Sequence, residues 1–154
     1  MAYKKIKSHK MIEDELRQLW HETYCDKSQP IYTFDNVLVK FYDDMFDHAF
    51  FESEDRKKGD KSIFSLNRCE KMLWIKDALQ DPDAIIKQGW NKSEKTYSDN
   101  RRVTLVKGNY MVIIRFIKVN IAKFVTAYQN DNDNNLQKVL DSPDWEGSDK
   151  WIKK

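Results

Sequence analysis

The sequence predicts an α+β fold, with helices first and an antiparallel meander of strands after them. Apolar residues recur at helical spacing over 11–25 and 65–80, whereas short β-type runs separated by turn residues occupy 95–129. Helices followed by a run of strands are typical of this class, because each kind of element buries one apolar face. The 154 residues suit one domain over 1–154 with a single core.

The first predicted element is an amphipathic helix within 1–28. The stretch "MIEDELRQLWHETYC" repeats apolar residues at helical spacing, and its acids Glu13, Asp14 and Glu15 come early, where they favour the helix dipole. The next stretch, 31–53, is rich in β-branched and aromatic residues, which favours strand or extended structure. The charged run 52–62 then predicts an exposed loop or a flap.

The strongest helical pattern begins at "SLNRCEKMLWIKDALQ" and forms one apolar stripe along its length. Asn67 and Glu70 resemble a capping box at its start, and Pro82 predicts its end near Leu79 or Gln80. A short helical turn is expected through 81–89.

The runs "KTYSD", "RRVTLVKG", "NYMVIIRFI" and "IAKFVTAYQ" predict the strands of the meander. Within the third run Arg115 is a solvent-facing or functional charge in an otherwise apolar strand. The Asn and Asp residues that follow the fourth run would cap one last short helix, and 142–154 is expected to be a tail.

The composition indicates a globular chain whose charges nearly cancel. Aromatic residues make up 13% of the sequence, which is too rich for a disordered chain. The 27 basic and 25 acidic residues leave a formal net charge of +2, which does not support a generally nucleic-acid-coating protein. Any anion-binding site must therefore come from local placement of charge.

The sequence predicts a cytoplasmic protein without membrane contact. The amino terminus lacks the continuous apolar stretch of a secretory signal, and "NYMVIIRFI" is too short to cross a bilayer. Cys25 and Cys69 lie in predicted helices with no Cys-x-x-Cys and no Cys/His cluster. This usage favours buried thiols in a reducing compartment and no structural zinc site.

The motifs of several enzyme classes are missing from the sequence. His9, His21 and His48 lack the spacing of helical metal motifs, so no catalytic metal is expected. With 4 glycines and no glycine-rich phosphate loop, the sequence also predicts no nucleotide site and no organic cofactor. The remaining residue types suit metal-free cleavage of RNA, which needs proton-transfer groups and donors to the phosphate.

His48 and Arg68 are the first candidates for that chemistry. His48 lies between aromatic residues in "FDHAFF", and Arg68 stands near the start of the long helical pattern, where a helix terminus favours anions. The alternatives are a hydrogen-bonded structural histidine and a solvated arginine.

Further candidates come from the strands. Lys95, Tyr97 and Arg102 form a basic and aromatic patch suited to phosphates and bases, or a hairpin edge protected by charge. Thr126 and Tyr128 place two hydroxyls on one strand face, together with Phe124 by the period of two. These two residues form the edge of a site, or they are ordinary strand residues.

Taken in order, the histidine of "FDHAFF", the helix "RCEKMLWIKDALQDPDAI", the strand "KTYS" and the closing "FVTAY" resemble the barnase/EndoU/colicin/RelE-like ribonuclease superfamily, in particular its small phage-type branches. The resemblance implies helices packed on a curved antiparallel sheet and a ribonuclease site on the open face of that sheet, with no metal. It also implies that His48 transfers protons, that Arg68 stabilises the phosphate, and that Thr126 and Tyr128 reach the scissile phosphate. The long charged stretch between His48 and Arg68 departs from the pattern.

The function expected from these features is endoribonuclease activity that leaves a cyclic phosphate. RNA is the expected substrate, and the resemblance implies a toxin or effector with an immunity or antitoxin protein as a partner. The alternative is a non-catalytic interaction module, either an immunity-type protein or an inactive family member.

Overall fold

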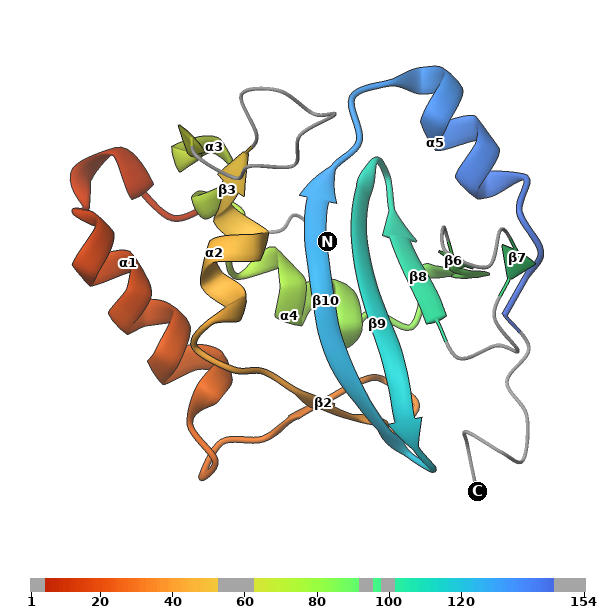
Figure 1. Ribbon diagram of the computed structural model, residues 1–154, viewed down its shortest axis with the longest axis horizontal. Coiled ribbons are helices and arrows are strands. Elements are labelled where there is room, and N and C mark those ends of the chain that lie inside the picture. Colours follow the sequence, from red (N-terminus) through yellow and green to blue (C-terminus); the bar gives the residue numbers. More distant parts are fainter. Residues whose placement is uncertain (1–4, 53–62, 92–95, 98–101, 146–154) are drawn as a thin grey trace.

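The structure, a computed structural model, has an α+β fold and describes residues 5–52, 63–91, 96–97 and 102–145 (Figure 1). Its main sheet has six strands in the order β1-β2-β10-β9-β8-β5. The strands are β1 Ile31–Tyr32, β2 Leu38–Lys40, β5 Ile85–Gln88, β8 Arg102–Lys107, β9 Tyr110–Lys118 and β10 Ile121–Gln129. Two short pairs lie apart from it, β3 Phe51–Glu52 with β4 Ile63–Phe64 and β6 Trp90–Asn91 with β7 Thr96–Tyr97.

The sequence-based α+β class is confirmed, and three of the four strands expected in the meander form it as β8-β9-β10. The first expected strand, around Thr96 and Tyr97, pairs instead with Trp90–Asn91 in a separate sheet, so its place in the meander is wrong. One pairing is parallel, because β2 lies alongside the first residues of β10, with Lys40 opposite Lys123. The sheet is therefore mixed. Parallel neighbours need a long connection, and the chain between β2 and β10 contains α2, α3, α4 and most of the sheet.

Helices precede most of the strands, as the sequence predicts. They are α1 Glu13–Trp20, the π-helical continuation η2 His21–Cys25, α2 Met45–Phe50, α3 Leu66–Cys69, α4 Trp74–Leu79 and, after the sheet, α5 Asp133–Leu140; a short 3-10 turn, η1 Ser8–Lys10, comes first. Asn132 caps α5 by accepting a hydrogen bond from the Asn135 backbone at 3.0 Å. None of the described helices is long and apolar enough to cross a membrane.

An aromatic core lies between the helices and one face of the sheet. Trp20 of α1 is 1% exposed and its ring lies 5.5 Å from those of Phe41 and Phe50 and 5.7 Å from that of Phe124. Its indole N–H donates to the backbone oxygen of Tyr42 at 3.1 Å, so the buried polar group is satisfied. Figure 1 shows α4 behind β9 and β10, on this same inner face.

Three local predictions are wrong in detail. Residues 45–50 form helix α2 rather than extended structure, because Met45, Phe46, Ala49 and Phe50 bury one helical face. The helix expected over 65–80 is split into α3 and α4, and its amino-terminal cap is Ser65 instead of Asn67. The turn expected through 81–89 contains strand β5, which pairs with β8. The end of α4 at Leu79 agrees with the effect of Pro82.

A bulge in β10 changes which residues share a face. Phe124 lies opposite Ile114 of β9, but Thr126 lies opposite the adjacent residue Ile113. Val125 is the extra residue, so Thr126 and Tyr128 share one face while Phe124 lies on the other. The predicted pairing of Thr126 with Tyr128 is therefore confirmed and their grouping with Phe124 is wrong.

The sheet face that carries Thr126 and Tyr128 is called the outer face below. By strand register it also carries Arg102 of β8, Arg115 of β9 and Lys123 of β10. Near the β8–β9 turn this face is covered, since Val106 and Met111 are buried. Among the described helices, none crosses β9 and β10 on this side in Figure 1.

Candidate functional site

Arg68 connects two helices to the end of β10. Its backbone N–H donates to the Ser65 cap at 3.1 Å, which fixes the residue in the first turn of α3. Its guanidinium donates to the Ala49 carbonyl of α2 at 3.4 Å and lies 5.9 Å from the ring centre of Tyr128. The arginine therefore brings together α2, α3 and the carboxyl end of β10.

Tyr128 is half-buried beneath this arginine. Burial raises the pKa of its phenol above the usual value of 10, and the positive charge of Arg68 acts in the opposite direction. The phenol is thus protonated at neutral pH and available as a hydrogen-bond donor. Thr126, two residues earlier, is also half-buried and lies on the same outer face.

His48 lies in the last turn of α2, immediately before the residue whose carbonyl Arg68 contacts. It is exposed, whereas its neighbours Ala49 and Phe50 belong to the core. α2 packs beside β10, as Figure 1 shows. The predicted catalytic residues therefore belong to three elements that Arg68 joins.

The three predicted substrate-binding residues are placed differently. Lys95 lies outside the described residues, as does the charged stretch 53–62. The backbone of Tyr97 pairs with Trp90 in β6–β7. Arg102 begins β8 on the outer face.

Arg102 is the first of four basic residues that lie side by side across the sheet. Arg102 is directly opposite Arg115, Arg115 is opposite Lys123, and Lys123 is opposite Lys40 of β2. We call these four residues the cation row. Neighbouring strands lie about 4.8 Å apart, so the row spans about 14 Å. All four side chains are partly exposed.

The cation row is electrostatically unfavourable by itself. Like charges directly opposite one another in a sheet are destabilising, and burial together with the charge of Arg115 lowers the pKa of Arg102. Among the residues that the structure describes, no aspartate or glutamate forms a salt bridge with a member of the cation row; the lysine and arginine salt bridges in this part of the chain are formed by other residues. A bound polyanion would relieve the repulsion.

An aromatic ring lies at one end of the row. Tyr42, which is 45% exposed, has its ring centre 5.5 Å from the Lys123 ammonium. At the other end the aliphatic part of Arg102 packs on Gly89, where an added Cβ would lie 2.2 Å from Arg102 Cγ. Glycine at position 89 thus leaves room for the arginine.

Sequence reasoning found only two members of the row. It proposed Arg102 and noted Arg115 as a solvent-facing or functional charge, but it missed Lys40 and Lys123. Both missed lysines stand on strands whose pairing joins distant parts of the chain. Period-two alternation places each lysine on a face, but only the strand order places the lysines next to each other.

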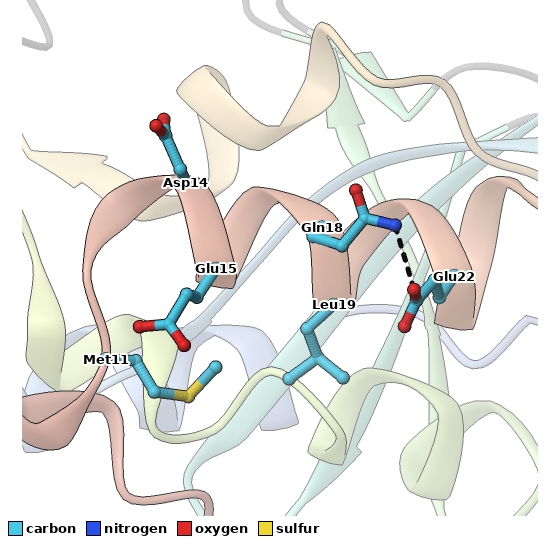
Figure 2. A pocket seen from close by; sticks show the side chains of 6 residues that line it. All are labelled: Met11, Asp14, Glu15, Gln18, Leu19 and Glu22. Atoms are coloured by element: carbon cyan, nitrogen blue, oxygen red, sulfur yellow. Dashed lines mark hydrogen bonds between the residues drawn. The ribbon is translucent and has the colours of Figure 1, made fainter.

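Two hollows of the described surface lie away from Arg68 and β10. One of about 350 Å³ lies beside Trp20 and His21, and one of about 430 Å³ runs along α1 (Figure 2), lined by Met11, Asp14, Glu15, Gln18, Leu19 and Glu22. In the latter, Gln18 donates a hydrogen bond to Glu22 at 2.8 Å, and three carboxylates make it acidic. An acidic hollow repels the phosphates of a nucleic acid, so this surface is unsuited to binding one.

Comparisons of this chain with protein-family models, with curated proteins and with solved structures found no match.

Proposed function

We propose that this protein is a metal-independent endoribonuclease that holds single-stranded RNA on its outer face and cleaves it next to Arg68. The observation that carries the proposal is that the cation row and Tyr128, which Arg68 covers, share one face of the sheet. Phosphates need fixed positive charge, and exposed single-strand bases need aromatic or guanidinium surfaces on which to stack.

The stretch of β10 between the cation row and Arg68 is long enough to support a short segment of single-stranded RNA. Lys123 and Tyr128 are five residues apart on β10, which corresponds to about 16 Å at ~3.3 Å per residue. A strand bound at the row can therefore continue along β10 toward Arg68. Tyr42, beside Lys123, offers a ring on which an RNA base can stack where the strand crosses the cation row.

In the proposed reaction the ribose 2′-oxygen attacks the adjacent phosphorus. The new 2′-O–P bond forms while the bond from phosphorus to the 5′-oxygen breaks, and a 2′,3′-cyclic phosphate remains. His48 removes the proton of the 2′-hydroxyl or supplies one to the leaving 5′-oxygen. Arg68 stabilises charge on the phosphate oxygens, and the Tyr128 and Thr126 hydroxyls donate hydrogen bonds to them.

Cleavage of labelled RNA in the presence of a chelator tests this proposal. The parent protein should yield fragments with cyclic phosphate ends, and His48→Ala should slow their formation by about 10²–10⁴-fold while the protein stays folded. His9→Ala is the histidine control, because it removes another exposed imidazole, from η1, whose Ser8 hydroxyl donates to α3 at the Leu66 carbonyl; it should leave the rate unchanged. Equal rates for His48→Ala and the parent would remove His48 from the mechanism.

We also propose where the protein acts and what restrains it. RNA is the substrate, the cytoplasm is the place of action, and the protein acts as a toxin or effector that an immunity or antitoxin protein restrains. The outer face, where the cation row lies, is the surface that such an inhibitor would cover.

A non-catalytic interaction module is the second candidate. It is favoured by the observation that the hollows of about 430 Å³ and 350 Å³ are lined by residues other than His48, Arg68, Thr126 and Tyr128. Under this alternative the parent protein binds RNA or a protein partner without producing any cyclic phosphate. The same cleavage assay, combined with a binding measurement, separates the two functions.

A further inference from the structure

The structure brings together three metal-ligating side chains that the sequence pattern did not connect. The side-chain ligand atoms of His21, Cys25 and Asp43 all lie within 4.8 Å of one another. His21 Nδ1 is 2.8 Å from Asp43 Oδ1. The sequence prediction that no Cys/His cluster surrounds Cys25 is therefore wrong, because His21 precedes it by one helical turn.

The local fold explains how the three groups meet. His21 and Cys25 are the first and last residues of η2, and side chains four apart on a helix lie on the same face. π-helical turns occur often at functional sites. Asp43 comes from the segment between β2 and α2, so the third group approaches from a different part of the chain.

We propose that His21, Cys25 and Asp43 bind one zinc ion. Imidazole nitrogen, thiolate sulfur and carboxylate oxygen are the ligands that Zn²⁺ takes, and magnesium or calcium would not select a thiolate. With zinc–ligand bonds of about 2.0–2.3 Å and tetrahedral angles, ligand atoms lie roughly 3.3–3.6 Å apart. The present distances therefore need only small side-chain rotations.

The surroundings favour a cation at this position. The carboxylates of Glu22 and Asp26 act electrostatically on His21, and Asp44 acts on Cys25. The nearby Arg17 is held by Asp47 at 2.6 Å and by Glu13 at 3.1 Å, so its charge is compensated. His21 and Asp43 line the hollow of about 350 Å³, so an ion can approach these two ligands from solvent.

This zinc would have a structural effect. It would join η2 to the segment that begins α2, which carries His48 at its other end. The ligands do not include Arg68 or Tyr128, so the proposed zinc site and the proposed metal-free cleavage are independent of each other.

Titration with Co²⁺, a spectroscopic substitute for zinc, tests the site directly. The parent should bind one ion per chain and show a near-ultraviolet charge-transfer band from thiolate to metal. Cys25→Ser should abolish this band, and His21→Ala and Asp43→Asn should each weaken Zn²⁺ binding at least about tenfold. Zinc should raise the thermal midpoint of the parent and not that of Cys25→Ser.

Two control variants address binding at other groups. Cys69→Ala removes the second thiol and His9→Ala removes a histidine outside the cluster, and both should retain the band and the parent affinity. Circular dichroism establishes that each variant is folded. A parent without the band at saturating Co²⁺ would overturn the proposal, as would a band that survives Cys25→Ser or disappears in a folded Cys69→Ala.

Discussion

At the scale of single residues, the proposed chemistry depends most on Arg68. Its guanidinium contacts the Ala49 carbonyl of α2 and lies over the ring of Tyr128, so one side chain positions two other elements. A planar guanidinium can make two parallel hydrogen bonds to a phosphate, and an ammonium cannot. The planar guanidinium also makes a cation–π contact with the ring of Tyr128, which an ammonium would make as a compact charge.

Arg68→Lys should therefore lower the rate of RNA cleavage by about 10²-fold or more while retaining the positive charge. The measurement is the single-turnover cleavage rate at saturating protein. Arg17→Lys, on the acidic side of α1, is the matched control and should not change the rate. Cleavage by Arg68→Lys within about twofold of the parent would count against a phosphate-binding role.

Tyr128→Phe removes the hydroxyl of Tyr128 and keeps its ring, so the variant tests the hydroxyl alone. In the described structure the phenol makes no hydrogen bond with the protein, so its removal should change the free energy of unfolding by less than about 0.5 kcal/mol. Turnover per folded molecule should fall, because in the proposed mechanism the hydroxyl donates a hydrogen bond to the substrate phosphate. Unchanged turnover at unchanged stability would exclude that role for the hydroxyl.

At the scale of elements, strand pairing creates the cation row from residues that are far apart in sequence. Lys40 and Lys123 lie next to each other only because β2 and β10 pair in parallel. The row puts like charges opposite one another on four strands, which is unfavourable unless an anion binds. This arrangement is the main argument for a polyanionic ligand.

Arg115→Gln should act on RNA binding and on stability in opposite directions. Loss of one central charge should weaken the affinity for RNA of any sequence. It should also lower the number of counterions released on binding, read from the slope of log affinity against log salt, by about one. Relief of repulsion from Arg102 and Lys123 should leave the free energy of unfolding unchanged or slightly higher. Lys138→Gln on the exposed face of α5 is the control, and an equal loss of affinity there would indicate only a general charge effect.

The sequence could predict those elements whose signals are local. The apolar stripe and early acids of α1, the end of α4 before Pro82 and the three strands of the meander depend on neighbours in the chain. Helix α2 was misjudged because its aromatic residues favour strands by propensity, while burial of one helical face decides its actual structure.

The site residues show the same division between local and long-range information. Thr126 and Tyr128 share a face because the period of two is local, but the bulge at Val125 moves Phe124 to the other face and depends on pairing with β9. The cation row and the His21, Cys25 and Asp43 cluster require tertiary contacts. The spacing of His21 and Cys25, four residues apart in one predicted helix, is local, but no pattern in a single strand or helix indicates the approach of Asp43 or the order of the cation row.

At the scale of the whole molecule, the aromatic core separates the two surfaces of the sheet. The rings of Trp20, Phe41 and Phe124 join α1, the end of β2 and β10 on the inner face. The outer face is thereby left to carry charge. Stability and the proposed function thus reside on opposite sides of the same strands.

Phe124→Ala should consequently destabilise the protein by about 3–5 kcal/mol, because Phe124 is 1% exposed and its loss leaves a cavity against Trp20 and Phe41. Chemical denaturation measures this free energy. Phe34→Ala is the control, since that ring is 38% exposed and should cost much less. A loss below about 1 kcal/mol at Phe124 would contradict the central place of this ring.

The most direct test of the account is the chemical identity of the RNA products made by purified protein in chelator. We predict 2′,3′-cyclic phosphate ends from the parent protein, strongly reduced product from Arg68→Lys, and undiminished product from Arg17→Lys. Intact RNA across a range of pH and protein concentration, with RNA binding still detectable, would contradict cleavage and favour the non-catalytic interaction module.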